Sequence, residues 1–563
     1  MKCCCVFFVV LALLVVAQLN AQLKVDPTFF SYPLDLKPKL NANFGEMRPN
    51  HFHMGLDLST DSRENLPVYA PADGYIARIK IEQGGFGRAI YLNHPNGLTT
   101  LYAHMNRFIP EAELYLKSRQ YDSSSWAIDL NISEKVLPIK KGQLIGYSGN
   151  TGASQGPHVH FEIRDTKTEN CYNPLRFKFP IVDHIAPSIL KLAFYNRAKS
   201  IYEQVPKVVS LVKLGNSYKV PGLISLPFSD VFIGLFAIDR MNGVSNQYGV
   251  FKTELFHEKE LISSFEMEDI GYDKTRYLNG HIDFTTRSKG GSYFQMLFPP
   301  ISYGLDLYNP KAVPFSVAIN KSPTAYLLKV YDAFGNMSTA TFQVQGNDLK
   351  QPESVAEGQK MISGNVNIVE DDMIRFVFNE DAFYDSFHFN YTSLEANAQD
   401  VISSTYKVAN EHIPVHSYYT VSIKPNKNNA VTDPSKVLVR RTRQGKIELK
   451  KAILEKDLYT ARFRELGIFQ LLEDRIPPVI SSNIYSGQRL SGSSRITIDI
   501  TDNNKTIKDF KATLDGQWLL FQPVGNRFFY YPDEHFSMGE HKLSIVVYDE
   551  VGNKSTKEWI LSR

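Results

Sequence analysis

Residues 156–164 constrain the fold of this chain more than any other stretch, because their side chains alternate between two kinds of chemistry. On an extended strand, successive side chains point to opposite sides of a sheet, so His158, His160 and Glu162 share one face. The opposite face carries the apolar side chains Val159, Phe161 and Ile163. Two neighbouring imidazoles repel each other when protonated, and a divalent metal avoids this by binding the neutral rings. The stretch therefore predicts a strand with a core face and a metal-binding face, provided that partner ligands lie elsewhere.

Partner ligands stand upstream, within residues 44–57. Four extended residues separate His53 from Asp57 by roughly 13 Å, whereas zinc ligands sit about 2 Å from one ion. We expect Gly55 to let the backbone bend between them and to keep the metal position free of a side chain. With His160, this makes two imidazoles and one carboxylate, with a fourth position left for water. Such a donor set is typical of a catalytic zinc site.

Further motifs follow in order along the chain. His-x-Gly-x-Asp at 53–57 precedes Leu-Tyr-Ala-His at 101–104, Gly-Asn-Thr-Gly at 149–152 and the strand at 156–164. In this order the motifs resemble the LytM/lysostaphin-type zinc metallopeptidases, bacterial enzymes that cut peptide bonds in peptidoglycan. The resemblance covers residues 44–164 and implies an antiparallel-sheet peptidase fold there.

The resemblance also implies a role for five residues. His53, Asp57 and His160 would hold one Zn²⁺, and His158 and His104 would be catalytic histidines that do not bind the metal. Zinc lowers the pKa of a bound water to about 7. We expect His158 to take the proton of this water, and a protonated His104 to hydrogen-bond to the oxyanion or to the water.

Two other side chains beside the motifs have less definite interpretations. Glu162 shares a strand face with His158 and His160, and it either orients a ligand from behind or forms a solvent-facing salt bridge. His51 is an additional histidine next to the first motif, and we leave it outside the site.

The N-terminal residues 1–21 have the layout of a secretory signal, with Lys2, an apolar run over 6–16 and small or polar residues up to Ala21. The apolar run is short for a transmembrane span. We expect cleavage after Ala21, with an uncleaved membrane anchor as the alternative. Cleavage leaves Cys171 as the only cysteine, so no disulfide forms within the mature chain. These features predict an exported protein of the periplasm, cell envelope or extracellular space, without a stable membrane span.

The chain as a whole is long, almost neutral and rich in aromatic residues. It has 563 residues, of which 62 are basic, 59 acidic, 36 Phe and 30 Tyr. The charge balance argues against a general nucleic-acid binder, and the length predicts roughly three or four domains. The absence of long helical periodicity predicts a mostly β fold. We expect the peptidase domain at 22–180, with its core at 44–164 and an insertion at 110–138 that either walls the substrate groove or forms a surface excursion.

An internal repeat appears beyond residue 180. Residues 183–189 and 474–480 share Asp-x-Ile-x-Pro-x-Ile, and residues 330–336 and 547–553 share Val-Tyr-Asp-x-x-Gly-Asn. The first phrase predicts a Pro-stiffened linker entering a strand, and the second predicts a strand running into a turn. Each pair brackets a β-sandwich of immunoglobulin-like character. We therefore expect a β-sandwich with an insertion at 183–348, a β-rich domain at 351–473 and an immunoglobulin-like domain at 474–563.

These features together predict an exported zinc metalloendopeptidase that hydrolyses peptide bonds through a zinc-bound water, with the peptide stems or cross-bridges of peptidoglycan as the leading substrate. The β-sandwich domains would position it in the envelope and offer surfaces to envelope proteins. A basic hairpin at 436–451 either meets an anionic cell-wall polymer or is a solvated sheet edge. Two alternatives stay open, namely a non-catalytic LytM-like regulator or wall-binding protein, and a secreted protease acting on protein substrates.

Overall fold

The computed structural model describes residues 26–300, 304–309, 316–347, 357–396, 398, 400–426, 431–505 and 507–563. In these residues the chain consists mainly of antiparallel β-sheets with few and short helices, so the predicted mostly β class is confirmed. The predicted signal at 1–21 lies outside the described residues. Within the described part, no helix combines the length and the apolar character that a membrane crossing requires.

A ten-stranded sheet organises the N-terminal domain, and β13 lies inside it. β13 pairs antiparallel with β4 on one side and with β8 on the other, so the two motif segments become neighbours. β7 and β8 pair antiparallel as a hairpin around the turn at 94–97. The main path of the sheet follows the order β1 (Leu40–Ala42), β4 (Leu56–Ser59), β13 (His158–Asp165), β8 (Leu98–Ala103), β7 (Arg88–Asn93), β6 (Gly74–Ile81), β10 (Ile128–Asn131).

The alternation of β13 places its apolar side chains in the core. Val159, Phe161 and Ile163 are each 0 % exposed. The polar face is covered as well, because His158, His160 and Glu162 are also buried. A buried polar face must find hydrogen-bond partners inside the protein, and the surroundings of these three side chains supply them.

The predicted insertion extends one edge of this sheet and adds a helix. β10 and β11 (Pro138–Ile139) both pair with β6. Between β9 (Arg107–Phe108) and β10 lies α2 (Pro110–Ser123), which starts with a proline where a missing N–H is harmless and ends at Ser124 in the left-handed conformation. β9 itself belongs to a small separate sheet with β5 (Pro67–Tyr69) and β12 (Leu144–Tyr147).

Residues 188–346 form two sheets whose apolar core is continuous with that of the N-terminal domain. β22 (Asp269–Ile270) pairs with β14 (Cys171–Tyr172), which pairs with β13, so a strand of the second region extends the sheet of the first. The two regions therefore pack as one body, which their separate sequence patterns did not suggest. The other elements are β15 (Ser188–Asn196), β16 (Lys207–Ser210), β17 (Val212–Leu214), β18 (Ser217–Leu226), β19 (Asp230–Ile238), β20 (Lys252–His257), β21 (Glu260–Glu266), α3 (Leu278–His281), α4 (Phe284–Ser288), β23 (Gln295–Met296), β24 (Val317–Ala318), β25 (Thr324–Tyr331), β26 (Met337–Gly346).

Two further regions each have a hydrophobic core of their own. The first contains β28 (Asn367–Glu370), β29 (Ile374–Phe378), β31 (Tyr391–Leu394), β32 (Thr405–Val408), β33 (Pro414–Ile423), β34 (Val437–Arg443), β35 (Lys446–Lys451), β36 (Ile453–Glu455), β37 (Leu458–Glu465), β38 (Ile468–Glu473). The second contains β39 (Val479–Ser482), β40 (Gln488–Arg489), β41 (Ile496–Thr501), β42 (Ile507–Leu514), β43 (Gln517–Trp518), β44 (Gln522–Val524), β45 (Arg527–Tyr530), β46 (Glu540–Asp549), β47 (Lys554–Ser562). Each of these two regions therefore has its own core, whereas the predicted domains at 22–180 and 183–348 share one.

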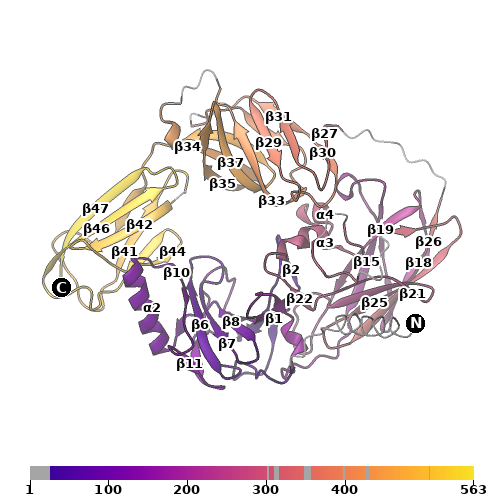
Figure 1. Ribbon diagram of the computed structural model, residues 1–563, viewed down its shortest axis with the longest axis horizontal. Helices are drawn as coiled ribbons and strands as arrows, with labels where there is room; N and C mark the ends of the chain where they lie inside the picture. The colour runs from indigo at the N-terminus through magenta and orange to yellow at the C-terminus, as the bar shows by residue number, and fades with distance from the viewer. Residues whose placement is uncertain are drawn as a thin grey trace, which may run out of the picture.

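The chain curves round so that its last sheets return to the first domain (Figure 1). The contact is made on α2, where Lys117 Nζ lies 2.7 Å from Asp533 Oδ2. The ring of Tyr121 stacks on that of His535 with 3.7 Å between the centroids. The helix of the insertion is thus a docking surface for the C-terminal domain within the same chain.

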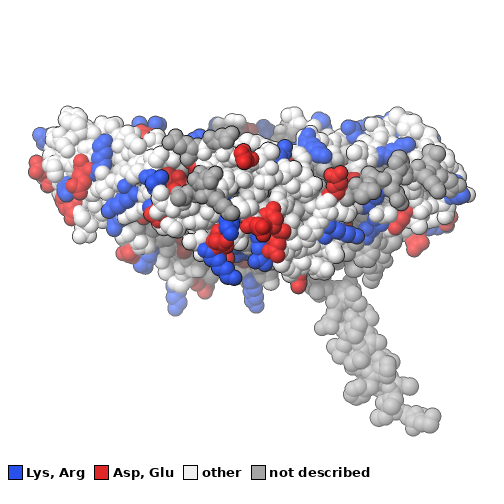
Figure 2. Space-filling view, turned by 90° about the horizontal axis from the view of Figure 1, so that it is seen from above, with Lys and Arg blue, Asp and Glu red and all other residues white. Residues whose placement is uncertain are grey.

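Positive and negative side chains are interspersed over the face seen in Figure 2, with neither sign dominating. The basic hairpin β34–β35 fits this pattern. Arg441 lies 2.8 Å from Glu448 and 3.2 Å from Glu465, and Arg443 lies 3.5 Å from Glu465. These two arginines are largely buried on β34 and pair within the protein, so they are not available to an anionic polymer.

Candidate metal centre

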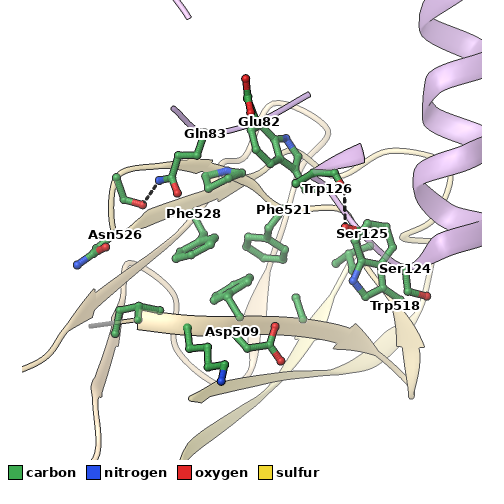
Figure 3. Close-up of a pocket in the computed structure, with 18 residues that line it drawn as sticks. Glu82, Gln83, Ser124, Ser125, Trp126, Asp509, Trp518, Phe521, Asn526 and Phe528 are labelled. Atoms are coloured by element: carbon green, nitrogen blue, oxygen red, sulfur yellow. Dashed lines mark hydrogen bonds between the residues drawn. The ribbon is translucent and has the colours of Figure 1, made fainter. Parts of the chain in front are cut away.

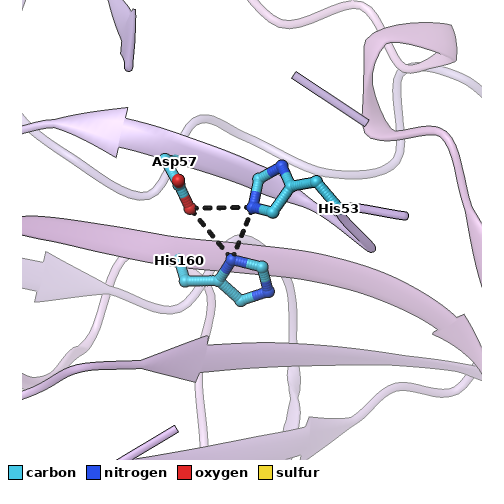
Figure 4. Close-up of side chains that lie close together, drawn as sticks. All are labelled: His53, Asp57 and His160. Atoms are coloured by element: carbon cyan, nitrogen blue, oxygen red, sulfur yellow. Dashed lines mark hydrogen bonds and ion pairs between the residues drawn. The ribbon is translucent and has the colours of Figure 1, made fainter. Parts of the chain in front are cut away.

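Three of the predicted site residues meet at one point (Figure 4). Asp57 on β4 lies directly opposite His160 on β13, and His53 comes from the loop that precedes β4. The Nε2 atom of His53 is 3.0 Å from Asp57 Oδ1 and 3.0 Å from His160 Nδ1, and the last two atoms are 2.9 Å apart. A tetrahedral ion with bonds of about 2.0–2.1 Å spaces its ligand atoms by roughly 3.3 Å. The triangle is therefore close to the size that one zinc ion needs.

Hydrogen bonds on the outer side of the two rings decide which nitrogens face this point. His53 Nδ1 lies 2.7 Å from the carbonyl oxygen of Asn43, and His160 Nε2 lies 2.8 Å from a carboxylate oxygen of Glu162. Both partners are acceptors, so the outer nitrogens donate their N–H and the inner nitrogens keep lone pairs. Two lone pairs and a carboxylate oxygen thus converge, and a cation satisfies all three together. The donor set fits zinc.

The two predicted catalytic histidines lie beside the triangle. His158 Nδ1 is 2.8 Å from the carbonyl oxygen of Gly156, and His104 Nδ1 is 2.8 Å from that of Thr151. In each ring the other nitrogen therefore carries the lone pair. The Nε2 atom of His158 lies 3.4 Å from Asp57 Oδ1. The ring centroids of His104 and His158 are 4.8 Å apart. The structure thus brings all five predicted residues into one cluster.

The backbone around His104 is held in an unusual conformation. His104 follows β8 with φ at +61°, in the left-handed region that side chains rarely adopt. Its backbone N–H donates to the carbonyl of Phe86, at 3.0 Å. The loop that presents Thr151 approaches the β6–β7 loop so closely that a Cβ on Gly152 would lie 2.3 Å from Gly87 N. The glycines of this loop therefore serve the backbone packing that positions His104.

The charges of the centre shift the histidine pKa values in opposite directions. Burial lowers the pKa of His160, but hydrogen bonds to Asp57 and Glu162 outweigh it and raise this pKa to about 9. Burial, together with the neighbouring His160 and His158 rings, lowers the pKa of His104 to about 3. Without a cation, the carboxylates therefore draw a proton onto a ring in the centre. This shows that the pocket favours a positive charge at the triangle.

A buried carboxylate stands behind His160. Glu162 is 0 % exposed, and the oxygen that accepts from His160 also accepts from the hydroxyl of Tyr272, at 2.8 Å. Its second oxygen accepts from Arg164 Nε at 2.6 Å. Although burial raises the pKa of Glu162, the Arg164 charge lowers it to about 2. The interpretation of Glu162 as a solvent-facing salt bridge is therefore wrong, because its partners lie inside the protein and one of them is a ring of the triangle.

Three supporting residues were missed by the sequence reasoning, namely Asn43, Arg164 and Tyr272. Arg164 has the same strand parity as His160 and Glu162, so extending the alternation would have found it. The sequence around Asn43 and around Tyr272 contains no pattern that would predict their contact with the centre. Tyr272 stands 110 residues from Glu162 along the chain and reaches the centre only because the second region packs on the first.

Two residues of the first motif segment, Gly55 and His51, lie beside the triangle without belonging to it. A Cβ on Gly55 would lie 2.3 Å from the carbonyl oxygen of Phe161 and 2.8 Å from Glu162 Cγ. The expectation that Gly55 clears the metal position is corrected accordingly, since the glycine is needed where the chain passes against β13. His51 is exposed and its Nδ1 lies 2.9 Å from the carbonyl of Pro49, outside the triangle.

A groove of about 320 Å³ lies between the insertion and the C-terminal domain (Figure 3). Its lining includes Trp126 from the first domain and Trp518 and Phe528 from the last. Gln83 crosses the junction and donates to the carbonyl of Gly525. None of the five clustered site residues lines this groove, so it is a separate feature of the surface.

Two family models match parts of the chain. Residues 51–120 and 129–174 match peptidase family M23, and residues 359–474 match the Zu5-like domain. The first match contains all five clustered residues, and its gap falls within the predicted insertion.

Similar proteins each match about a quarter of the chain or less. An uncharacterized metalloprotease of Haemophilus influenzae is 31% identical over 161 residues, covering 27% of this chain and 28% of that protein. The DD-carboxypeptidase/endopeptidase Mpg of Neisseria meningitidis serogroup B is 34% identical over 112 residues, covering 20% of each chain. This chain therefore spans less than a third of the length of these relatives. The catalytic domain of lysostaphin from Staphylococcus simulans is 22% identical, with a TM-score of 0.19, covering 25% of this chain and 91% of that one.

Proposed function

Taking as premise that the chain carries a zinc-dependent peptidase family M23 domain, we propose that it is an exported metalloendopeptidase that hydrolyses peptide bonds of peptidoglycan. One observation carries the proposal. Two imidazole lone pairs and a carboxylate oxygen converge within 2.9–3.0 Å of one another, with two more histidines beside them. Similarity to the peptidoglycan DD-endopeptidase ShyA of Vibrio cholerae, 26% identical over 141 residues, supports the substrate class, and the signal-like sequence at 1–21 supports export.

The proposed metal ligands are His53, Asp57 and His160. A zinc ion held there would activate a water and polarise the carbonyl of the scissile bond. His158 is the proposed general base. Its Nδ1–H is held by the carbonyl of Gly156, so its Nε2 lone pair is directed toward the cluster and can accept a proton. The ring therefore needs no rearrangement before the proton transfer.

His104 has a proton-transfer role that differs from our expectation. With its Nδ1–H committed to Thr151 and its pKa lowered to about 3 by burial, the ring is neutral at pH 7. A neutral ring in this tautomer has a lone pair at Nε2 and cannot donate there to an oxyanion. We therefore replace the expected protonated His104 by a neutral ring, whose Nε2 lone pair would accept a hydrogen bond from the attacking water. The proton that His158 takes from this water would be the one delivered to the leaving amine as the C–N bond breaks.

Glu162 is proposed to position His160. Its carboxylate accepts the outer N–H of that ring, which fixes the tautomer and makes the inner nitrogen a better electron donor. Arg164 and Tyr272 hold the carboxylate in turn, at 2.6 and 2.8 Å. Glu162 is thus a positioning residue, since it contacts a ligand and not the substrate.

The test uses the mature chain, residues 22–563, purified with zinc and incubated with isolated sacculi. Mass spectrometry of the released muropeptides measures cleavage, and elemental analysis measures zinc per chain. We expect His158→Ala to retain zinc and to lose muropeptide release, because the triangle does not include this ring. The matched control is His51→Ala, an exposed histidine outside the cluster, which should change neither quantity.

Two outcomes would contradict the proposal. Zinc binding without any bond cleavage by the unmodified protein would identify a non-catalytic regulator or wall-binding protein. Hydrolysis of casein with intact sacculi would identify a protease of protein substrates. Each result separates the peptidoglycan proposal from one of the alternatives left open by the sequence.

A further inference from the structure

Two groups of three aspartates occupy equivalent places in the two repeated regions. They are Asp183, Asp239, Asp332 and Asp474, Asp502, Asp549. Within each group, one carboxylate oxygen from every residue lies within 4.8 Å of those of the other two. The first aspartate belongs to the Asp-x-Ile-x-Pro-x-Ile phrase, the second directly follows a strand (β19 or β41), and the third belongs to the Val-Tyr-Asp-x-x-Gly-Asn phrase. The fold therefore assembles the same cluster twice from distant segments.

Hydrogen bonds to the turn after β25 fix the positions of Asp332 and Asp183 in the first group. Oδ1 of Asp332 accepts two backbone N–H groups of its own turn, at 2.8 and 2.9 Å. The side-chain amide of Asn336 donates to Asp332 Oδ2 at 2.6 Å and to the backbone carbonyl of Asp183 at 3.2 Å. The closing turn of the region is thus tied to the linker that opens it, and the carboxylates of Asp183 and Asp332 are brought together.

The second group repeats these contacts. Oδ1 of Asp549 accepts two backbone N–H groups of its turn, at 2.7 and 3.0 Å. The amide of Asn553 donates to Asp549 Oδ2 at 2.7 Å and to the backbone carbonyl of Asp474 at 3.0 Å. Two copies with the same bonding pattern indicate a built arrangement, since chance clustering would not reproduce the hydrogen bonds behind the carboxylates.

Carboxylate oxygens in both groups are buried without a hydrogen-bond partner. Asp183, Asp239 and Asp332 are 5 %, 1 % and 2 % exposed, and neither Asp183 Oδ2 nor Asp239 Oδ1 has a hydrogen-bond donor, since the side chain that meets Asp183 is the carboxylate of Asp332. In the second group Asp474 is 2 % exposed, and its Oδ2 is likewise without a partner. An unsatisfied buried polar atom is costly, and native proteins leave few of them. These oxygens therefore point to a ligand.

Positive side chains do not supply the missing partner. Among the described residues, no Lys, Arg or His forms an ion pair with Asp183, Asp239 or Asp332. Burial, followed by the charge of Asp332, raises the pKa of Asp239 to about 8. The first group thus collects three carboxylates whose mutual repulsion requires either a bound cation or bound protons.

We propose that each group of three aspartates is a calcium site. All the convergent donors are carboxylate oxygens, with no imidazole or thiolate, and hard oxygen donors select Ca²⁺ or Mg²⁺ over zinc. Calcium accepts irregular sets of six to eight oxygens, and a carboxylate can supply one or two of them. Magnesium demands a regular octahedron and retains its waters, which suits these crowded and buried groups less well.

The two sites lie at junctions between regions of the chain. The turn that holds Asp549 contacts the preceding region, where Lys436 Nζ donates to the carbonyl of Val551 at 3.2 Å and Val551 packs in a cluster with Leu438 and Leu472. In the first site, Asp239 exchanges two backbone hydrogen bonds with Tyr248. An ion at either position would tie the incoming linker to the sheet that follows, and would make the junction stiffer.

The first junction also reaches the N-terminal domain. The hydroxyl of Tyr248 donates to the carbonyl of Leu40, at 2.7 Å, and the neighbouring Gly249 exchanges hydrogen bonds with the side chain of Asn43. Calcium at the first site would therefore stabilise the packing of the second region on the domain that carries the histidine centre.

Metal content of the whole mature chain tests the proposal. The protein is stripped with EGTA, which also removes zinc, then reloaded with one equivalent of zinc, dialysed against calcium chloride in the presence of excess magnesium, and analysed for all three metals. We expect two calcium ions per chain beside zinc, and a melting temperature that rises with calcium concentration. Asp239→Asn and Asp474→Asn should each retain one calcium. The matched control Asp230→Asn, an exposed carboxylate on β19, should retain both.

Other results would overturn the assignment. If no calcium is retained and the melting temperature does not respond to it, the aspartates share protons, and Asp239→Asn should then stabilise the protein. Magnesium retained in place of calcium would also contradict it. If a variant fails to fold, the calcium content of the unmodified protein still decides the question, and none of these measurements depends on peptidase activity.

Discussion

The centre around His160 and the group around Asp239 both bury converging acceptor atoms, yet they differ in what stands behind them. At the histidine centre, each outer N–H is committed to a carbonyl or a carboxylate, which turns nitrogen lone pairs inward. At the aspartate groups, backbone N–H groups of a turn hold one oxygen of Asp332 or Asp549, and other oxygens are left for a ligand. The supporting hydrogen bonds thus decide which donor atoms are presented, and the donor atoms decide which ion fits.

A buried histidine outside the centre shows that burial alone does not create such a site. His281 is 0 % exposed, and its two nitrogens lie 2.9 Å from the hydroxyl of Tyr308 and 3.2 Å from Gln295 Oε1. Burial lowers its pKa to about 4. His160, also buried, has a pKa raised to about 9 because two carboxylates contact it. The carboxylates, and not the burial, make the second environment attractive to a cation.

The largest expected effect is that of His160→Ala. Removing this ring leaves His53 and Asp57 as the only ligands of the triangle and removes the N–H that His160 donates to Glu162. We expect zinc content and muropeptide release both to fall to background, while the calcium content stays unchanged. Elemental analysis and the sacculus assay measure these quantities on the same sample. Loss of calcium together with zinc would show that the two kinds of site are not independent.

Selective chelation should separate the two kinds of site almost as strongly. Removal of zinc with 1,10-phenanthroline should abolish hydrolysis, because the histidine centre loses its ion. Removal of calcium with EGTA, followed by restoration of zinc because EGTA also binds zinc, should lower the melting temperature, because the aspartates at the junctions then repel one another. Differential scanning calorimetry and the sacculus assay check these outcomes, and added zinc or calcium should reverse only the matching effect. A melting temperature insensitive to EGTA would contradict the proposal that the aspartate groups bind calcium.

A moderate effect is expected from Glu162→Gln. The amide oxygen can still accept the N–H of His160, but the negative charge that makes the ring more basic is lost. Loss of such a supporting contact weakens metal binding by about 10–100-fold. Competition with a zinc-binding dye measures the affinity. Glu169→Gln is the matched control, since this exposed carboxylate lies 3.6 Å from Arg164 but does not contact the triangle.

Per pH unit, the smallest expected effect is the pH dependence of zinc binding. The metal-free centre holds a proton on His160 below a pKa of about 9, and zinc must displace it. The apparent zinc affinity should therefore rise about tenfold per pH unit up to pH 9 and level off above it. Dye competition across this pH range checks the slope. A flat profile between pH 7 and 9 would mean that the ring is already neutral without the metal.

The sequence predicted much of the centre because its signals are local. The alternation at 156–164 places His160 and Glu162 on one strand face, and the order of the motifs points to His53, Asp57 and His104. The parts that sequence reasoning missed depend on packing between segments. Tyr272 comes from another region, and the reason for Gly55 is a backbone that passes 2.3 Å from where its Cβ would be.

The aspartate groups also depend on packing that the sequence does not reveal. The repeated phrases around Asp183 and Asp332 were recognised as a linker and a turn, which they are. Their convergence with Asp239 was not visible, because each phrase alone is an ordinary capping arrangement of a short polar side chain. Only the pairing of β15 with β19 and of β25 with β26 brings the three carboxylates together.

By itself, the sequence determined the strand alternation, the turns and the kinds of donor atoms available, since these depend on side-chain chemistry and on the two-residue period of a strand. Tertiary structure decided which donors meet, which of their hydrogen bonds are already used, and which charges remain buried without a partner. These properties depend on contacts between residues far apart in the chain. The hydrogen bonds and charge interactions between such residues become strong only where the surrounding protein excludes water.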